Sequence, residues 1–243
     1  MRKPEISIIL PVWNAQSTLE QTLQSILNQT DVSFELIVLD NESTDGSREI
    51  IQSFQPQIHH FISGKDRGVY DAMNRGIQQA TGKWLYFIGA DDYLASDDSL
   101  KNVLAYAEED ADLLIGEIEY AGGAASNTRT HYPPRFDKGL VWRNVVHHQA
   151  CLYRSRCFEE YRYPIRFGIL GDYHLNLWLW NTGSKAALAP TLLAVCGADG
   201  ISKRYTSQLY GQELEIKKEL LEGWKLWVQP IWLFSKKWFK KLT

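Results

Sequence analysis

The hydrophobic residues of the first half of the chain form two alternating patterns. Mostly apolar runs of strand length occupy residues 6–12, 34–39 and 84–88, with a shorter run at 59–62. Between them, apolar residues recur at helical spacing over residues 17–28, 48–54 and 70–81. Runs without a polar face are typical of strands that are buried on both sides, as in parallel sheets. The strand–helix–strand order therefore predicts a right-handed βαβ arrangement and a Rossmann-like α/β fold.

The second half has a less regular pattern. It predicts a helix over residues 100–107, a strand over 112–120, a hairpin turn over 121–127 and a returning strand near 128–132. A helix rich in glutamate and lysine is expected over 207–221. We therefore expect a mixed, mostly parallel sheet flanked by helices and followed by a C-terminal helical tail.

Two adjacent carboxylates follow the apolar run at 84–88. Asp91 and Asp92 stand at the carboxyl end of this predicted strand. Ligands of open α/β sheets bind outside the carboxyl ends of the strands. Neighbouring carboxylates repel each other, and a hard divalent cation held together with a substrate phosphate relieves that repulsion. The alternative is an acidic cap on the next helix, since Asp97 and Asp98 follow closely.

The first two predicted strands also end in side chains suited to binding. The first ends in Pro11, Val12, Trp13 and Asn14, and the second ends in Asp40. Trp13 can stack on a base and Asp40 can accept hydrogen bonds from a base or ribose; the alternatives are a core aromatic and a cap for the following turn. No G-x-G-x-x-G sequence follows the first strand, which speaks against a dinucleotide cofactor. Together these groups predict a ligand site at one edge of the sheet.

Composition narrows the choice of partners and compartment. The chain has 243 residues, 44% of them hydrophobic, enough for one large α/β domain or for one domain with an appendage. A net charge of -3 argues against nucleic acid as a partner. The N-terminus does not resemble a secretory signal, and no run approaches the roughly 20 apolar residues of a spanning helix. Cys151, Cys157 and Cys196 are expected to be buried thiols in a reducing cytoplasm.

Residues 224–243 combine tryptophans with a one-sided charge. Four of the nine tryptophans and five lysines lie there without an acidic residue, which leaves the rest of the chain with a net charge of about -8. Tryptophan favours the membrane interface, and lysine is attracted to anionic head groups. We expect peripheral contact with the inner leaflet. The alternative is a helix that packs its aromatic residues on the domain or on a second subunit.

Four ordered motifs resemble those of family 2 glycosyltransferases, which have the GT-A fold. The motifs are ISIILPVWN at 6–14, LDNESTDG at 39–46, DRGVYDAMNRG at 66–76 and GADD at 89–92. The resemblance is greatest to small soluble members that build bacterial surface polysaccharides. The chain shows neither the several spanning helices nor the Q-x-x-R-W motif of the processive synthases, so we expect transfer of one sugar per encounter.

The resemblance implies a nucleotide pocket lined by residues 11–14, with Trp13 stacked on uracil or another base and Asp40 at the base edge. Asp92 would bind Mg²⁺ or Mn²⁺ directly, and Asp91 would face the ribose or a metal-bound water. Such a cation neutralises a diphosphate as it leaves. The resemblance also places four donor-binding residues in the loop over 63–74, namely Lys65, Asp66, Arg67 and Asn74.

Two stretches of the second half carry further resemblance. Residues 146–154 look like a His-Gln-containing strand of the same subgroup, in which His148 or Gln149 shapes the donor-sugar pocket and His147 is structural. Residues 167–178 resemble the segment that carries the catalytic base, which would be Asp172. A carboxylate there removes the acceptor proton during inversion, although an aspartate also caps a helix well. The lesser candidates for the base are Glu117 and Glu119.

Together these features predict an inverting, metal-dependent glycosyltransferase that uses a nucleoside-diphosphate sugar, and we expect a UDP-sugar. The acceptor would be a glycan or a polyprenyl-linked saccharide on the cytoplasmic face of the membrane. We expect a GT-A domain over 1–205, with a nucleotide-binding half at 1–95 and an acceptor half at 96–205, and a tail at 206–243. The alternatives are a sugar nucleotidyltransferase, which should carry a glycine-rich basic loop after the first strand, and a non-catalytic nucleotide-sugar sensor.

Overall fold

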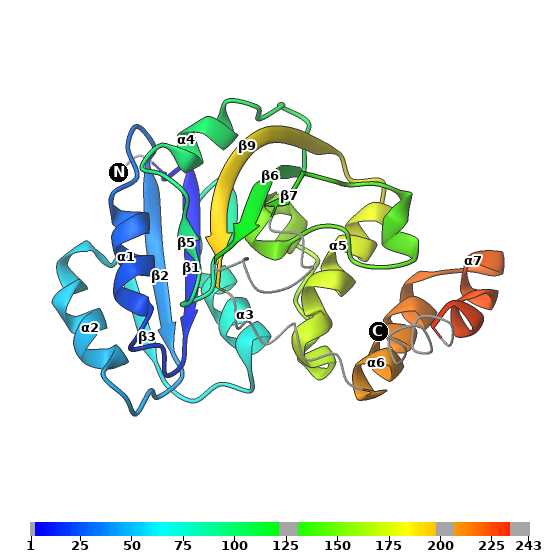
Figure 1. Ribbon diagram of the computed structural model, residues 1–243, viewed down its shortest axis with the longest axis horizontal. Helices are drawn as coiled ribbons and strands as arrows, with labels where there is room; N and C mark the ends of the chain where they lie inside the picture. The colour runs from blue at the N-terminus through cyan, green and yellow to red at the C-terminus, as the bar shows by residue number, and fades with distance from the viewer. Residues whose placement is uncertain (1–2, 122–130, 198–206, 234–243) are drawn as a thin grey trace.

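The computed structural model describes residues 3–121, 131–197 and 207–233, which form a mixed α/β structure (Figure 1). Within these residues, nine strands build one sheet in the order β3-β2-β1-β4-β8-β6-β9-β5, with β7 paired to β6. The strands are β1 (Ile6–Val12), β2 (Phe34–Asp40), β3 (His60–Ser63), β4 (Trp84–Phe87), β5 (Tyr93–Leu94), β6 (Leu113–Tyr120), β7 (His131–Tyr132), β8 (Cys151–Arg154) and β9 (Ala186–Cys196). The helices are α1 (Leu19–Leu27), α2 (Ser47–Ser53), α3 (Val69–Gln79), α4 (Ser99–Leu104), α5 (Gly171–Asn181), α6 (Ser207–Leu220) and α7 (Gly223–Trp227). The predicted α/β fold is confirmed.

Strands β1 to β4 form the parallel part of the sheet, as the apolar runs predict. Val12 lies beside Asp40 and Asp40 lies beside Ser63, so β1, β2 and β3 end at one edge. Strand β4 runs parallel to β1, with Phe87 beside Ile9. Helices α1 and α2 cover one side of these strands and α3 covers the other (Figure 1). Burial on both sides explains why β1, β2 and β4 are mostly apolar.

The second half of the sheet is mixed. Strand β8 is antiparallel to β4 and β6, while β9 is parallel to β6. The pattern did not predict β9, because Pro190 argues against a central strand. Pro190 falls where the register shifts between the pairs Ile115–Leu188 and Glu117–Leu192, so it interrupts no regular ladder. Strands β6 and β7 pair as the expected hairpin, although residues 122–130 lie outside the described part.

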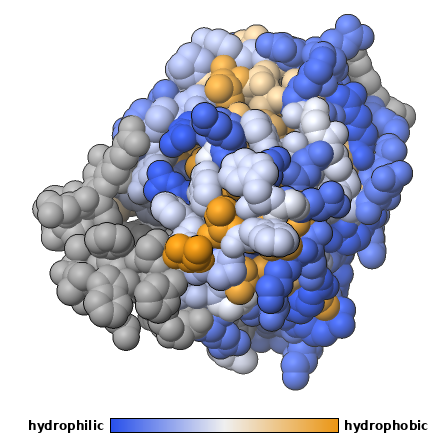
Figure 2. Space-filling model, turned by 90° about the vertical axis from the view of Figure 1, so that its right-hand side faces the viewer, coloured by the Kyte–Doolittle hydropathy of each residue, from blue (hydrophilic) through white to orange (hydrophobic). Residues whose placement is uncertain are grey.

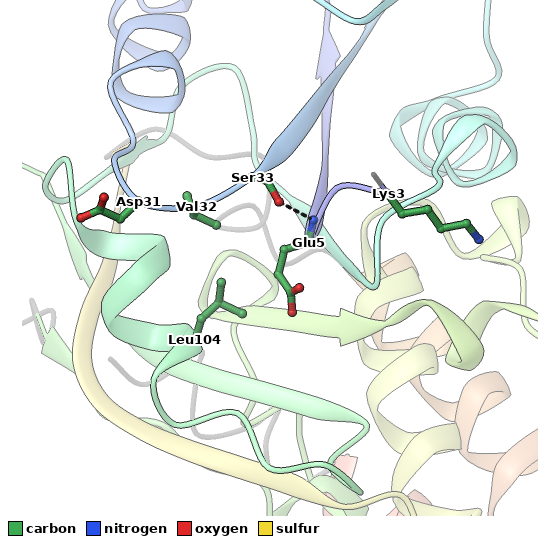
Figure 3. A pocket seen from close by; sticks show the side chains of 6 residues that line it. All are labelled: Lys3, Glu5, Asp31, Val32, Ser33 and Leu104. Carbon is green, nitrogen blue, oxygen red and sulfur yellow. Dashed lines mark hydrogen bonds between the residues drawn. The ribbon is translucent and has the colours of Figure 1, made fainter. Parts of the chain in front are cut away.

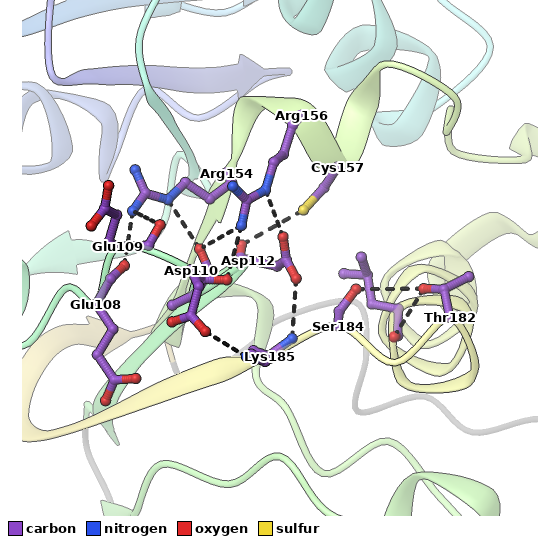
Figure 4. Close-up of polar contacts among 12 residues, drawn as sticks. Glu108, Glu109, Asp110, Asp112, Arg154, Arg156, Cys157, Thr182, Ser184 and Lys185 are labelled. Atoms are coloured by element: carbon purple, nitrogen blue, oxygen red, sulfur yellow. Dashed lines mark hydrogen bonds and ion pairs between the residues drawn. The ribbon is translucent and has the colours of Figure 1, made fainter.

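Polar contacts close the edge at which β1 and β4 begin (Figure 4). The buried Arg154, at the end of β8, donates to the carbonyl oxygens of Ala111 and Glu108 at 3.0 and 2.9 Å. Its guanidinium lies 4.0 Å from the centre of the Trp84 ring. Near the starts of β1 and β2 lies a pocket that is lined by Lys3, Glu5, Asp31, Val32, Ser33 and Leu104 (Figure 3). The predicted site residues that follow β1, β2 and β4 lie at the opposite edge of the sheet.

Helix α6 is anchored by a buried ion pair. Lys217 Nζ lies 2.9 Å from Glu213 Oε1, one helical turn earlier, and both side chains are buried. Lys217 Nζ also donates to the Trp142 carbonyl oxygen at 2.9 Å. The indole N–H of Trp232 donates to the same oxygen at 3.2 Å. The C-terminal helices are therefore joined to the segment around Trp142.

Three large apolar side chains lie exposed on the stretch that begins with α7. Trp224, Trp227 and Ile231 are 67%, 82% and 74% exposed. Figure 2 shows this end of the molecule, where apolar surface lies among hydrophilic residues. Within the described residues, no helix has both the length and the apolar character needed to cross a bilayer. Two of the tryptophans of the tail, Trp224 and Trp227, therefore lie on the surface. Residues 234–243 lie outside the described part.

The cysteines are buried, as predicted. Cys151 begins β8, Cys157 follows that strand, and Cys196 ends β9. Burial raises the pKa of the Cys157 thiol to about 12 and that of Cys151 well above its usual range. Both thiols are therefore protonated and shielded in the native fold.

Candidate active site

Trp13 is exposed at the end of β1. Its side chain is 65% exposed, so the core-aromatic alternative is wrong. Pro11 and Val12 belong to β1 itself, and Val12 is buried. Asn14 adopts a positive φ of 49°, which asparagine tolerates better than most residues, and its N–H donates to Ser43 Oγ at 2.9 Å. The loops after β1 and β2 thus support an exposed indole, a surface on which a planar base can stack.

Asp40 is enclosed at the end of β2. Its Oδ1 accepts the N–H of Ser43 at 3.1 Å, and its Oδ2 accepts the hydroxyl of Ser63 at 3.0 Å. Arg48 Nε lies 3.8 Å from the same Oδ2, and the Asp40 side chain is 0% exposed. In this arrangement Asp40 caps the following turn, which was the alternative from sequence. Its contact with a base stays a prediction and requires these partners to move.

The two adjacent carboxylates differ in exposure. Asp92 is 3% exposed; its Oδ1 accepts the N–H of Gly197 at 2.9 Å, and its Oδ2 accepts from Gly89 N at 3.2 Å and Gln149 Nε2 at 3.0 Å. Burial, followed by the charge of Asp91, raises the pKa of Asp92 to about 6. Asp91 is exposed. Asp91 is therefore the more accessible of the two carboxylates, and the direct contact of Asp92 with the cation stays a prediction.

Two glycines make room for these carboxylates. A Cβ on Gly89 would lie 2.7 Å from Asp92 Oδ2 and 2.9 Å from Asp91 Oδ1, and a Cβ on Gly197 would lie 3.0 Å from Asp91 Oδ2. Carboxylate oxygens suit Mg²⁺ and Mn²⁺, and Mg²⁺ is usually held by one or two carboxylates together with substrate phosphates. No group of three or more metal-ligating side chains gathers within the described ranges. Asp91 fits a site of this kind, in which phosphate oxygens complete the ligand set.

The loop between β3 and α3 brings charged groups to the same edge. Asp66 N–H donates to Asn41 Oδ1 at 2.9 Å, which ties the loop to the turn after β2. Lys65 and Arg67 are exposed, and Arg67 Nη2 lies 3.0 Å from Asp71 Oδ1. Lys65 and Arg67 are thus accessible to an anionic ligand.

Asn74 and His148 both hold Tyr163. The Asn74 amide bonds the backbone of Tyr163 twice, at 2.8 and 2.9 Å, so it faces away from the loop at 63–68. His148 is buried, stacks on Phe87 at 5.0 Å between ring centres, and its Nε2 lies 2.8 Å from the Tyr163 hydroxyl. Burial lowers the pKa of His148 to about 3. His147 packs on aromatic rings, and Gln149 alone of the His-Gln pair bonds a carboxylate of the candidate site.

Asp172 begins α5, as predicted, and is held from several sides. Its Oδ1 accepts the N–H of Tyr173 at 2.7 Å and the hydroxyl of Tyr70 at 3.3 Å. Its Oδ2 accepts Asn144 Nδ2 at 2.8 Å. Burial raises the pKa of Asp172 to about 6, against the lowering effect of these hydrogen bonds. A carboxylate with such a pKa is ionised at neutral pH and still basic enough to accept a proton.

One short segment connects Asp172 with Asp92. Asn144 bonds Asp172, and Gln149, five residues later, bonds Asp92. Tyr120 lies near both: burial is the main cause of its raised pKa, and the charges of Asp92 and Asp172 contribute. The residues at 144–149 therefore bring the carboxylate pair after β4 and the start of α5 to one region.

Sequence reasoning missed Tyr70 and Asn144. Tyr70 lies inside the motif at 66–76, so that motif could have drawn attention to it. Its ring also explains Gly171, because a Cβ there would lie 2.7 Å from the Tyr70 ring. Asn144 has no comparable signal, since its contact with Asp172 spans 28 residues and arises only in the fold. The lesser base candidate Glu117 is instead paired with His131 at 2.9 Å.

Comparison with known proteins agrees with this geometry. The family model described as Glycosyl transferase family 2 matches residues 7–179. A PGL/p-HBAD biosynthesis glycosyltransferase of Mycobacterium bovis is 38% identical over 183 residues, covering 73% of this chain and 70% of the relative. Glycosyltransferase GlyA of Streptococcus pneumoniae is 28% identical over 201 residues, covering 74% of this chain and 29% of the relative.

Solved structures share the fold at low sequence identity. S. aureus TarS 1-349 in complex with UDP-GlcNAc has a TM-score of 0.71 and 18% identity, and the match covers 87% of this chain and 65% of that one. Glucosyl-3-phosphoglycerate synthase from Mycobacterium tuberculosis, in complex with Mn²⁺, UDP and phosphoglyceric acid, has a TM-score of 0.63 and 18% identity, with 88% and 78% covered. These likenesses confirm the expected GT-A fold.

Proposed function

Since this chain belongs to glycosyl transferase family 2, we propose that it moves one sugar from a nucleoside-diphosphate sugar to a glycan or lipid-linked acceptor, with inversion. The observation that carries the proposal is the convergence on residues 144–149. The partly buried carboxylate of Asp172 lies there together with the carboxylate pair at the sheet edge. The named relatives in glycan biosynthesis support the acceptor class.

The donor site is proposed at the carboxyl ends of β1, β2 and β4. Trp13 offers a face for the base, and Lys65 and Arg67 lie within the loop that would approach the diphosphate. The S. aureus TarS and M. tuberculosis synthase structures contain UDP or UDP-GlcNAc, which supports uridine as the base. Stacking itself is tolerant of base identity.

Asp91 is the proposed protein ligand for Mn²⁺ or Mg²⁺, and Asp92 is proposed to hold the turn in place. Exposure supports this order, because Asp92 already accepts three N–H donors. The cation would supply charge stabilisation for the departing diphosphate. Gly89 and Gly197 leave the space beside Asp91 that phosphate oxygens would need.

Asp172 is the proposed general base. One of its carboxylate oxygens takes the proton from the acceptor hydroxyl as that oxygen forms a bond to the anomeric carbon. The bond from this carbon to the diphosphate breaks on the opposite face, and the nucleoside diphosphate leaves with the electron pair. Attack opposite the leaving group inverts the anomeric configuration. The raised pKa of about 6 supports a base that works above that pH.

The proposed division of labour follows the chain. Residues 1–95 bind the donor and residues 96–205 bind the acceptor. The tail at 206–243 is proposed to touch the inner leaflet through its tryptophans and lysines, which would place the enzyme at the cytoplasmic face, near a lipid-linked acceptor. The exposed Trp224, Trp227 and Ile231 support this contact.

Asp172→Asn tests the proposed chemistry. Turnover of a UDP-sugar panel with Mn²⁺, read as release of nucleoside diphosphate, should fall about 100-fold to 10,000-fold. Donor affinity, read by thermal shift, should stay close to that of the wild type. Donor binding without turnover in the wild type would support a sensor instead. Formation of a nucleotide sugar from a nucleoside triphosphate would support a nucleotidyltransferase.

A further inference from the structure

The amide of Asn144 has a fixed orientation. Its Oδ1 accepts Asn176 Nδ2 at 3.2 Å and the N–H of Val146 at 3.3 Å. Two donors at one end define that end as the oxygen, so Nδ2 must point the other way. Nδ2 is the group that donates to Asp172 Oδ2 at 2.8 Å. Asn144 can therefore only donate to this carboxylate.

The orientation is set from deeper in the core. Asn176 is 0% exposed, and its Oδ1 accepts the hydroxyl of Tyr153 at 3.0 Å. Burial keeps the pKa of Tyr153 well above its usual range, so that hydroxyl keeps its proton. The donors thus run in one direction, from Tyr153 through Asn176 and Asn144 to Asp172. A buried chain in which every amide end is satisfied holds its members rigidly.

We propose that Asn144 is a positioning residue for the base: its N–H fixes the rotamer of Asp172 and keeps the carboxylate in its proton-accepting form. The inference rests on the proposed role of Asp172. An N–H donor stabilises the ionised carboxylate and opposes the effect of burial. Asn144 comes from outside the stretch at 167–178, so it belongs to no motif that pointed to the base.

The surroundings of Asp172 make a pH profile interpretable. The charge of Asp172 contributes to the raised pKa of five tyrosines, namely Tyr70, Tyr120, Tyr153, Tyr161 and Tyr163. Burial raises the pKa of each, so all are neutral at the pH of an assay. On the same helix, His174 faces Tyr161 and Glu219 instead. Asp92, whose pKa burial also raises to about 6, bonds Gln149 and not Asn144, so a shift of the acid limb of kcat/KM in the Asn144 variants should report Asp172.

The test compares Asn144→Ala and Asn144→Asp with the wild type over pH 5 to 9, using the donor and acceptor that give turnover. Asn144→Ala should lower kcat about tenfold or more and move the acid limb to higher pH, with the KM for the donor unchanged. Asn144→Asp keeps the shape of the side chain but sets a second carboxylate against Asp172. It should move the limb further upward, because the pair shares one proton. The matched control is Asn102→Ala, an exposed asparagine of α4, which should leave the profile unchanged.

The positioning role would be overturned if the acid limb stays at the same pH in both Asn144 variants and their activity falls only as much as the fraction of folded protein falls. Asp172→Asn in the same assay separates the two levels of the argument. If that variant keeps its activity, the assignment of the base fails, whatever Asn144 does. If it is inactive while the Asn144 limb does not move, only the positioning role fails.

Discussion

Asp91 and Asp92 are neighbours in sequence but lie in different environments. Asp91 meets solvent, whereas Asp92 accepts hydrogen bonds from three protein N–H groups. We expect Asp91→Ala to change the free energy of unfolding by no more than about 0.5 kcal/mol, as is usual for an exposed site. Asp92→Ala should cost about 2 kcal/mol or more, because buried donors lose their acceptor. Urea unfolding measures both.

The same pair of variants assigns the cation. Asp91→Ala should abolish the extra thermal stability that Mn²⁺ gives in the presence of UDP, because bound ligand stabilises the fold by mass action. If Asp91→Ala keeps that effect, and Asp92→Ala loses it without any loss of stability, then Asp92 is the direct ligand, as the sequence motif suggested.

Asp172 should also leave a mark on stability. Its pKa is raised from 3.8 to about 6, so the carboxyl group of Asp172 binds a proton more tightly in the folded chain than in the unfolded chain. The stability that this proton provides is complete below about pH 4 and is lost as pH rises through 6. The loss is on the order of 2–3 kcal/mol. In Asp172→Asn, the free energy of unfolding should fall less between pH 4.5 and 7 than in the ligand-free wild type; parallel curves would contradict this.

At the scale of elements, the buried Lys217–Glu213 pair should control the docking of α6. Lys217→Met should cost about 3–5 kcal/mol, because it removes the ammonium group that lies 2.9 Å from the buried carboxylate of Glu213. The double variant Lys217→Met/Glu213→Leu should recover much of that loss, because both members of the ion pair are then replaced by apolar side chains. Urea unfolding of both variants measures the difference. A double variant as unstable as the sum of its parts would show that the pair is not acting as a unit.

The elements could largely be predicted from sequence where one physical rule dominated. The apolar runs that became β1, β2 and β4 are buried on both sides, so pattern and burial agree. Strand β9 was missed because Pro190 carries the opposite local signal, and only its place at a register shift makes it tolerable. At Pro190 the local preference of proline opposes a strand, but the pairing of β9 with β6 outweighs it.

The candidate site could be predicted only in part, for a related reason. The hydrophobic pattern pointed to Asp91 and Asp92, because they follow a predicted strand, and the family resemblance pointed to Asp172. Neither could find Asn144, whose amide reaches Asp172 across 28 residues. Nor could they tell which of two adjacent aspartates would be buried, since that depends on Gly197 and Gln149 approaching from elsewhere in the fold.

At the scale of the whole molecule, the exposed row on the α7 stretch should act as a contact with an anionic surface. The wild type should float with vesicles that contain phosphatidylglycerol and should not float with neutral ones. Replacing Trp224, Trp227 and Ile231 together with serine should reduce flotation severalfold, since each side chain is more than two-thirds exposed. The matched control is Tyr106→Ser, an exposed aromatic after α4. Equal flotation of the triple variant and the control would count against the contact.

The sheet carries the Arg154 hydrogen-bond network at one edge and the candidate site at the opposite edge. The starts of β1 and β4 are closed by Arg154 and its carbonyl partners. The ends of β1, β2 and β4 carry Trp13 and the carboxylates, together with loops fixed by side-chain hydrogen bonds. Parallel strands make this division natural, because all their carboxyl ends open on one side.

The rate at which the buried thiol of Cys151 is labelled can measure how often the sheet opens. A reagent such as 5,5′-dithiobis(2-nitrobenzoic acid) attacks thiolates, and this one is both protonated and enclosed in the central strand β8. Labelling must therefore wait for the sheet to open, so its rate reports the opening equilibrium in plain buffer. A nucleotide sugar bound at the carboxyl ends of the strands would stabilise the closed sheet and lower the labelling rate. The donor affinity could then be measured from that rate without a substrate analogue.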